Sequence, residues 1–279
     1  MRIALVANPG SGKGTEPEEI AARLRALGSE VELLELGDRV RGGVDRVVVA
    51  GGDGSVGLCA AAAGEAGVAL AVIPIGTAND FASFHDLPTD LGDACALAVN
   101  GARTVARELA RMDGRPFVNV ASGGLAPVAA QRAKPMKKVL GPGAYVLGAV
   151  SAGVTGDPFH CVARVDGRTV FDDEAWQVIV ASTGAFGGGA ELEETDPADG
   201  RLDLVAVPAG SRLGLPGRAL AMRRGDLGSQ DGVAHADGRT IVLDVEEKTL
   251  FNVDGEIVAC ESGRVEFTVA PAAYRLVLD

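Results

Sequence analysis

Short apolar runs alternate with helix-compatible segments through the first hundred residues. Continuous apolar runs at Ile3–Ala7, Val47–Ala50 and Ala69–Ile73 are typical of strands that are covered on both faces. Helix-compatible segments lie at Pro17–Leu27 and Val56–Ala63. This order predicts an α/β domain in which helices flank a parallel sheet.

The pattern changes near residue 103, where strand-like pieces divided by turns replace the alternation of strands and helices. Pieces such as CVARVDGRTVFD and LFNVDGEIVA each place a turn between two strand-like runs. They predict an antiparallel, β-sandwich-like second domain. We therefore divide the chain into domains at 1–102 and 103–279, with the last strand as a candidate to return to the first domain.

One apolar segment approaches the length of a membrane span. Residues 139–156 carry no charged side chain, but several glycines and a proline interrupt them. We interpret the segment 127–156 as a helical or irregular insert with buried or interfacial structure, and not as a transmembrane helix.

Charge and cysteine content exclude several classes of function. The chain has 26 Lys and Arg residues against 38 Asp and Glu residues, so its net charge of -12 opposes a general attraction to nucleic acid. The four cysteines are far apart and show no CxxC spacing, which indicates buried free thiols in a reducing compartment. Since a strand-like run begins at Arg2 without the pattern of a secretory signal, we expect a cytoplasmic protein.

Three glycine-rich or polar turns follow predicted strands of the first domain, at the strand ends where α/β sheets bind ligands. The turn Asn8–Thr15 resembles the phosphate loop of adenylate kinases, although Ala7 stands where a Walker A loop has glycine. The turn Gly51–Ser55 lets the backbone approach phosphates at the N-terminus of a helix. We expect Ser55 to cap that helix. The third turn is Pro74–Ala82.

Residues in the second and third turns leave alternatives open. A carboxylate at Asp53 is unusual beside phosphates: either it orders Mg2+ or a reacting hydroxyl, or it is an ordinary Asx-turn residue. In the third turn, Thr77 and Asn79 supply hydrogen bonds, whereas the simpler interpretation makes Asn79 or Asp80 a helix N-cap.

The motifs NPGSGKG, GGDGS and PIGTANDFA, in this order and each after a strand, resemble the diacylglycerol kinase catalytic domain of the lipid kinase superfamily. That family includes sphingosine and ceramide kinases and is related to NAD kinases. The resemblance covers the whole chain, because DPADGRLDLVAV (Asp196–Val207) and FNVDGEIVA (Phe251–Ala259) are similar to motifs of the family's second domain. The chain departs from the family pattern at Ser55, where threonine is usual, and after Leu36, where the following helix is shortened.

The resemblance implies ATP as the phosphoryl donor and a carboxylate as the proton acceptor for a lipid hydroxyl. Glu256 is the implied base, with Asp254 and Asp53 as its catalytic partners. From the residues alone, Asp254–Gly255 is also compatible with an ordinary hairpin turn. The ATP-binding residues that the resemblance implies are Asn8, Gly51, Gly52, Asp53, Gly54, Ser55, Thr77 and Asn79.

The resemblance also implies a Mg2+ site in the second domain. Its ligands would be Asp196, Asp199 and a main-chain oxygen near Arg201, since a hard cation prefers oxygen ligands. The alternative is an acidic surface loop.

Together these observations predict an ATP-dependent lipid kinase that transfers the γ-phosphate to a lipid hydroxyl, with diacylglycerol as the leading acceptor. Two alternatives stay open: an NAD kinase-like enzyme, and a catalytically inactive nucleotide- or lipid-binding regulator. We expect peripheral contact with the inner face of a membrane through Lys134, Lys137 and Lys138, which precede the apolar run 139–150. A homodimer is compatible with the sequence, and nucleic acid is not an expected partner.

Overall fold

The computed structural model describes the chain except for residues 9–14, 129–155, 186–191, 193–194 and 225. The described residues form two compact units: unit 1 comprises 1–109 and 270–279, and unit 2 comprises 110–269. Most of the first glycine-rich turn and of the expected insert lies outside the described residues, as do Lys134, Lys137 and Lys138.

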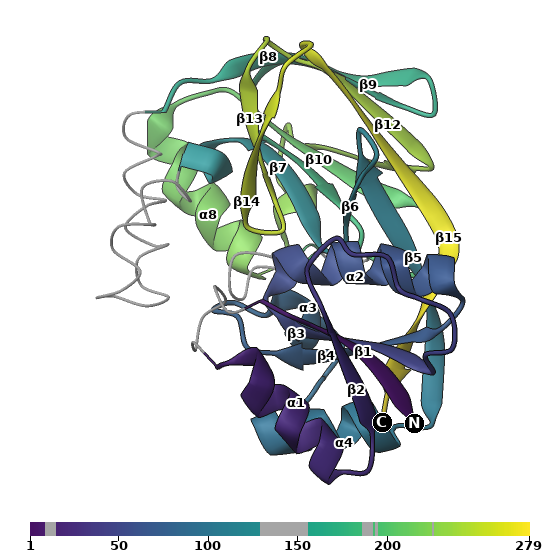
Figure 1. Cartoon of the computed structure of the whole chain (residues 1–279). Helices are drawn as coiled ribbons and strands as arrows, with labels where there is room; N and C mark the ends of the chain where they lie inside the picture. Colours follow the sequence, from purple (N-terminus) through teal and green to yellow (C-terminus); the bar gives the residue numbers. More distant parts are fainter. Residues whose placement is uncertain (9–14, 129–155, 186–191, 193–194, 225) are drawn as a thin grey trace. The chain divides into compact units, whose positions relative to one another are not determined.

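Unit 1 is a parallel sheet flanked by helices (Figure 1). Its strands are β1 (Arg2–Ala7), β2 (Glu30–Leu34), β3 (Arg46–Gly51) and β4 (Ala69–Pro74), and its helices are α1 (Pro17–Ala26), α2 (Asp53–Ala66), α3 (Asp80–Phe84) and α4 (Leu91–Asn100). The segment between β2 and β3 contains turns and no helix, as the shortened sequence indicated.

The strand order β2–β1–β3–β4 explains where the glycine-rich turns meet. The chain moves from β1 to β2 in one direction and from β3 to β4 in the other. Right-handed crossovers therefore place α1 and α2 on opposite faces of the sheet. The carboxyl ends of β1 and β3 lie side by side at this switch point, where open α/β sheets bind ligands.

Burial in unit 1 follows the apolar pattern. β3 is buried at all of its positions, because a central strand is covered on both faces. The last part of β15 (Arg264–Leu278) pairs in parallel with β4. A Cβ atom at Gly64 of α2 would lie 2.2 Å from the carbonyl oxygen of Ala273, so glycine allows β15 to pack close to α2.

Unit 2 is antiparallel. It contains β6 (Arg115–Phe117), β7 (Val120–Gly124), β8 (Phe159–Val165), β9 (Arg168–Ala181), β10 (Leu202–Pro208), β11 (Ala234–Gly238), β12 (Thr240–Asp244), β13 (Thr249–Val253), β14 (Glu256–Cys260), the 3-10 helices η2 (Arg212–Gly214) and η3 (Asp226–Ser229), and α8 (Leu215–Arg224). β5 (Arg103–Met112) and β15 contribute residues to both units.

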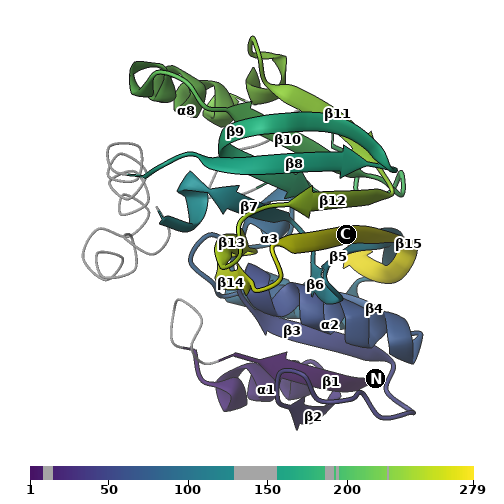
Figure 2. The ribbon, with the colours of Figure 1, turned by 90° about the horizontal axis from the view of Figure 1, so that it is seen from above.

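The long strand β9 pairs with three other strands of unit 2 (Figure 2). Its first half pairs with β8, and its second half pairs with β7 on one side and β10 on the other. Side chains on its two faces enter different apolar clusters: Val178 and Val180 pack with Phe251, whereas Trp176 and Ile179 pack with Leu227 of η3. The predicted fold class, an α/β domain followed by an antiparallel β domain, is confirmed.

Two sequence features can be checked directly. All four cysteines are buried and unpaired, and burial raises the pKa of Cys59 to about 12, so this thiol stays protonated. In the part of the chain that the structure describes, no helix combines the length and the apolar character needed to cross a bilayer.

Candidate active site

The GGDGS turn joins β3 to α2. Gly52, with an extended backbone, is the N-cap residue of α2, and the helix begins at Asp53. Ser55 is therefore not the cap, which corrects the sequence-based expectation. Its buried hydroxyl instead accepts a hydrogen bond from Asn8 Nδ2 at 3.2 Å. This contact ties the end of β1 to the first turn of α2.

The Asp53 side chain reaches across to the start of α3. Its Oδ1 accepts from the N–H of Phe81 at 2.9 Å, and its Oδ2 accepts from the N–H of Asp80 at 3.2 Å. These N–H groups belong to the first turn of a helix, where the backbone has no internal partner. Asp53 thus holds the second and third turns together, a role that neither alternative from the sequence included.

The two turns also approach each other through their backbones. The N–H of Ile75 donates to the carbonyl of Gly51 at 3.1 Å. A Cβ atom at Gly76 would lie 2.5 Å from the Cα of Gly52, so this contact requires glycine. Asn79 precedes α3 in a left-handed conformation (φ 54°), and its Nδ2 donates to the carbonyl of Gly76 at 3.1 Å. Asn79 is the N-cap residue of α3, as one of the two interpretations predicted, but its side chain makes no capping bond.

Unit 1 therefore gathers its predicted ATP-binding residues at one edge of its sheet. Asn8 follows β1, the GGDGS turn follows β3, and the exposed Thr77 lies with Asn79 after β4. The edge offers backbone N–H groups at the start of α2, amide and hydroxyl side chains, and one carboxylate. Such a surface suits the phosphates of a nucleotide.

In unit 2, Asp254 and Gly255 form the turn of the hairpin β13–β14. Both have positive φ angles, 46° and 88°, as a two-residue hairpin turn requires. The carboxylate of Asp254 accepts from the backbone N–H groups of Val118, Asn119 and Val120 at 2.8 to 3.1 Å. Asp254 therefore fixes the segment that leads into β7.

Glu256 is the first residue of β14 and is about half exposed, with a side-chain accessibility of 51%. Its carboxylate forms an ion pair with Arg115. Asp254 lies in the turn and Glu256 on the strand, so the alternation of side chains along a strand does not relate the two carboxylates.

Buried polar side chains near Asp254 were missed by the sequence analysis. Asn119 and Thr183 are each 2% exposed, and the Thr183 hydroxyl donates to Asn119 Oδ1 at 2.9 Å. Thr195 in turn donates to the carbonyl of Thr183 at 2.7 Å. The available signal was a polar residue inside an otherwise apolar strand-like run, as with Asn119 in FVNVAS. This chain of bonds connects the segment held by Asp254 to the loop that carries Asp196.

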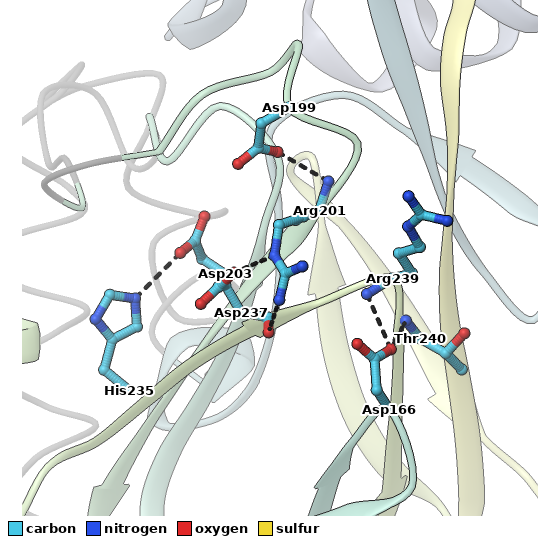
Figure 3. Close-up of polar contacts among 8 residues, drawn as sticks. All are labelled: Asp166, Asp199, Arg201, Asp203, His235, Asp237, Arg239 and Thr240. Atoms are coloured by element: carbon cyan, nitrogen blue, oxygen red, sulfur yellow. Dashed lines mark hydrogen bonds and ion pairs between the residues drawn. The ribbon is translucent and has the colours of Figure 1, made fainter.

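In the loop expected to bind Mg2+, both predicted carboxylates accept hydrogen bonds from backbone N–H groups of the same loop. Asp196 Oδ1 accepts from the N–H of Ala198 at 3.0 Å, and Asp199 Oδ1 accepts from the N–H of Arg201 at 2.8 Å. Figure 3 shows the Arg201 guanidinium directed at Asp237, with which it forms an ion pair that raises the pKa of Arg201. In the same view, His235 Nε2 lies 3.1 Å from Asp203 Oδ1.

These contacts bear on whether the loop suits a cation. Carboxylate oxygens are suitable ligands, but the positive charge of Arg201 lies close enough to Asp199 to interact with it. Within the described ranges, no three His, Cys, Asp or Glu side chains form a group that could hold a metal ion. The Mg2+ site at Asp196, Asp199 and a main-chain oxygen near Arg201 stays a prediction.

Each of the two units matches a known protein family. The model of the diacylglycerol kinase catalytic domain matches residues 2–109, and that of the YegS C-terminal NAD kinase beta sandwich-like domain matches residues 119–278. A "Probable lipid kinase YegS-like" of Klebsiella pneumoniae is 30% identical, over 96% of this chain and 95% of its own length. One from Pseudomonas aeruginosa is 31% identical, over 85% of this chain and 77% of its own length.

Solved structures share the fold. The crystal structure of a diacylglycerol kinase from Bacillus anthracis has a TM-score of 0.74 and 21% identity, covering 100% of this chain and 97% of that one. An NAD kinase from Archaeoglobus fulgidus, in complex with ATP, has a TM-score of 0.56 and 16% identity, covering 100% and 94%.

Proposed function

Since this chain belongs to the family of the diacylglycerol kinase catalytic domain with a YegS-type C-terminal domain, we propose that it is a lipid kinase that transfers the γ-phosphate of ATP to a lipid hydroxyl. The observation that carries the proposal is the GGDGS turn, whose Asp53 binds the first turn of α3 at the edge of the sheet. A glycine-rich turn at a helix N-terminus beside a strand switch point is a phosphate-binding arrangement.

Asn8, residues 51–55, Thr77 and Asn79 would hold the nucleotide. Gly52 and Gly54 are only partly buried, and without side chains they let phosphate oxygens approach the backbone closely. A negative side chain at Asp53 favours a nucleotide that carries a divalent cation, because the cation offsets repulsion between the carboxylate and the phosphates. Mg2+ bound with ATP is therefore part of the proposal.

A lipid hydroxyl must lose its proton as the phosphoryl group is transferred, and we assign the acceptor to Glu256. It is exposed enough to meet a substrate, and its present partner is a surface arginine that a substrate can displace at little cost, because such pairs contribute about 0–1 kcal/mol. Asp254 is less suited, because three backbone N–H groups already occupy its carboxylate. We therefore assign Asp254 to positioning.

A transfer assay tests the function. The purified chain is incubated with Mg2+ and ATP labelled at the γ-phosphate, together with diacylglycerol, sphingosine or ceramide in mixed micelles, or with NAD. We expect labelled product in the organic phase for at least one lipid and none for NAD. Labelled NADP without labelled lipid would replace the proposal with an NAD kinase. Nucleotide binding without transfer to any acceptor would favour the inactive regulator.

A further inference from the structure

Unit 1 contains a cavity of about 340 Å3 at the end of α3 that lies away from Asp53. The first turn of α3 meets the Asp53 carboxylate, whereas Phe84, its last residue, lines the cavity. Residues 85–88, which follow α3, form a second part of the lining. Strand β5 contributes Arg103 and Arg107. The residues to which ATP binding is assigned do not line this cavity.

Two of the residues that line the cavity each carry a buried polar atom with no hydrogen-bond partner among the described residues. His85 is 9% exposed, and its Nε2 is buried and unpartnered. The Nε of Arg107 is also buried and unpartnered, while its Nη1 donates to the carbonyl of Ala106 at 3.2 Å. Leaving a buried polar group without a hydrogen bond is costly, so a ligand whose acceptor reached both atoms would recover that cost.

The chemistry of these groups selects an acceptor as that ligand. A guanidinium Nε–H can only donate. Burial, with the positive charge of Arg107 as a second cause, lowers the pKa of His85 to about 3, so the imidazole is neutral at pH 7. A neutral imidazole can donate one N–H from Nε2 when Nδ1 carries no proton. An oxyanion would satisfy both groups.

The other lining residues define the rest of the ligand. The side chains of Asp86 and Asp279 offset those of the two arginines in formal charge, and Arg103 donates to the main-chain oxygen of Asp279 at 2.9 Å. The net charge of the lining side chains therefore does not select an anion. The N–H donors of Arg107 and His85 do. Half of the lining residues are apolar, among them Leu87 and Leu97. A purely polar ion would leave this apolar surface uncovered.

We propose that this cavity binds an amphiphilic anion, whose phosphate or carboxylate head accepts hydrogen bonds from Arg107 and His85 while a short alkyl part packs against Phe84, Leu87 and Leu97. The site is separate from the proposed kinase chemistry, and it does not depend on that chemistry.

Nuclear magnetic resonance of histidine-labelled protein tests the site. The chain has three histidines, and His160 and His235 belong to unit 2, where they serve as internal controls. The full chain, labelled with 15N in the imidazole rings, is titrated at pH 7.5 with hexyl phosphate, inorganic phosphate or hexanol. We expect saturable shifts of the His85 ring signals with hexyl phosphate, weaker binding of inorganic phosphate, and no shift with hexanol. The spectrum of His85→Gln identifies the signals.

Arg107→Gln provides the decisive variant, and Arg111→Gln is its matched control. Arg111 lies on the same strand and is partly buried like Arg107, but it donates to the carbonyl of Gly114 and does not line the cavity. We expect the affinity for hexyl phosphate to fall about tenfold or more in Arg107→Gln, as loss of a charged hydrogen bond implies, and to stay unchanged in Arg111→Gln.

Three results would overturn the inference: an unmoved His85 signal, equal affinity in the two arginine variants, or inorganic phosphate binding as tightly as hexyl phosphate. The spectra themselves show whether each variant is folded. Because the readout needs no turnover, failure of this site and failure of the kinase proposal are distinguishable.

Discussion

At the scale of single residues, Asp53 combines a structural contact with a proposed chemical role, and alanine would remove both. Asp53→Asn keeps a side-chain oxygen for the start of α3 but removes the negative charge. We expect the variant to remain folded while kcat falls by about 100-fold or more, the size of effect that loss of one preorganised electrostatic group has in other active sites. Turnover with the accepted lipid and a thermal melt measure the two roles separately.

Asp90 supplies the control for this change. It is the N-cap of α4, and its carboxylate accepts from the N–H groups of Gly92 and Asp93 at 2.8 and 3.1 Å. Asp90→Asn therefore removes the same charge from the same kind of helix start. Equal losses of turnover in both variants, or normal turnover in Asp53→Asn, would remove Asp53 from the chemistry.

Glu256→Gln keeps the shape of the side chain and removes its basicity. If Glu256 accepts the proton, we expect kcat to fall by about 10²- to 10⁴-fold and the acidic limb of the pH profile, which reports a base that must be deprotonated, to change. Arg115→Gln breaks the same ion pair but leaves the carboxylate in place, so this variant should keep most of its activity. A loss of less than threefold in Glu256→Gln would move the proton acceptor elsewhere.

His85 predicts a dependence of stability on pH. Burial lowers the pKa of His85 from 6.5 to about 3, so below pH 6.5 the unfolded chain binds a proton that the folded chain does not. The neutral His85 ring contributes its full share to the free energy of unfolding above pH 6.5. This contribution is lost progressively as the pH falls toward 3. Between pH 7 and 5 the loss is about 2 kcal/mol. Urea unfolding of His85→Gln should show a shallower decline than the wild type over this interval, and parallel curves would contradict the prediction.

At the scale of elements, α3 shows how a very short helix is held at both ends. It has five residues, too few to be stable alone, and its first turn depends on a carboxylate from the preceding crossover. Its last turn is followed by His85, whose ring packs edge-on against Phe81 and Phe84. The helix therefore depends on tertiary contacts more than on its own sequence.

The C-terminus of α4 depends on a residue from a strand. Arg46 of β3 is 7% exposed and donates to the carbonyls of Ala98 and Gly101 at 2.6 and 2.8 Å. The last turn of α4 has no basic residue of its own, so Arg46 supplies the positive charge that a helix C-terminus favours.

Arg46→Lys should lower the free energy of unfolding by about 2 kcal/mol, because lysine cannot reproduce the planar pair of hydrogen bonds. Urea unfolding measures the change. Arg41→Lys is the control, since the Arg41 side chain is 82% exposed. Its Nη1 lies 3.8 Å from Glu32 Oε1, in a surface ion pair. Equal effects in the two variants would show that the contacts with α4 are of little energetic value.

At the scale of the whole molecule, a net charge of -12 opposes adsorption to anionic lipid, so the predicted membrane contact requires a local basic segment. We expect the triple variant of Lys134, Lys137 and Lys138 to glutamate to lose binding to phosphatidylserine vesicles in a sedimentation assay. Three basic residues contribute about 1 kcal/mol each near such a surface. Equal sedimentation of variant and wild type, or wild-type binding that salt does not weaken, would exclude this docking segment.

The fold class and the chemical character of the turns could be predicted from the sequence alone. Continuous apolar runs such as VVVA predicted strands buried on both faces, and β3 is buried throughout. Strand-like pieces divided by turns predicted the antiparallel part, including the hairpin β13–β14. β11 was not among the predicted pieces: its sequence AHADG has no apolar run, and it forms by pairing with β10.

The partners of the functional side chains could not be predicted from the sequence, because they depend on how distant segments meet in the fold. Asp53 and Phe81 are 28 residues apart, and Asp254 and Val118 are 136 apart, so no local pattern relates them. The cavity beside His85 likewise combines residues from α4, β5 and the end of the chain. The reason is physical: local periodicity records which face of an element is buried, whereas the partner of a carboxylate or an imidazole depends on which elements the sheet order brings together.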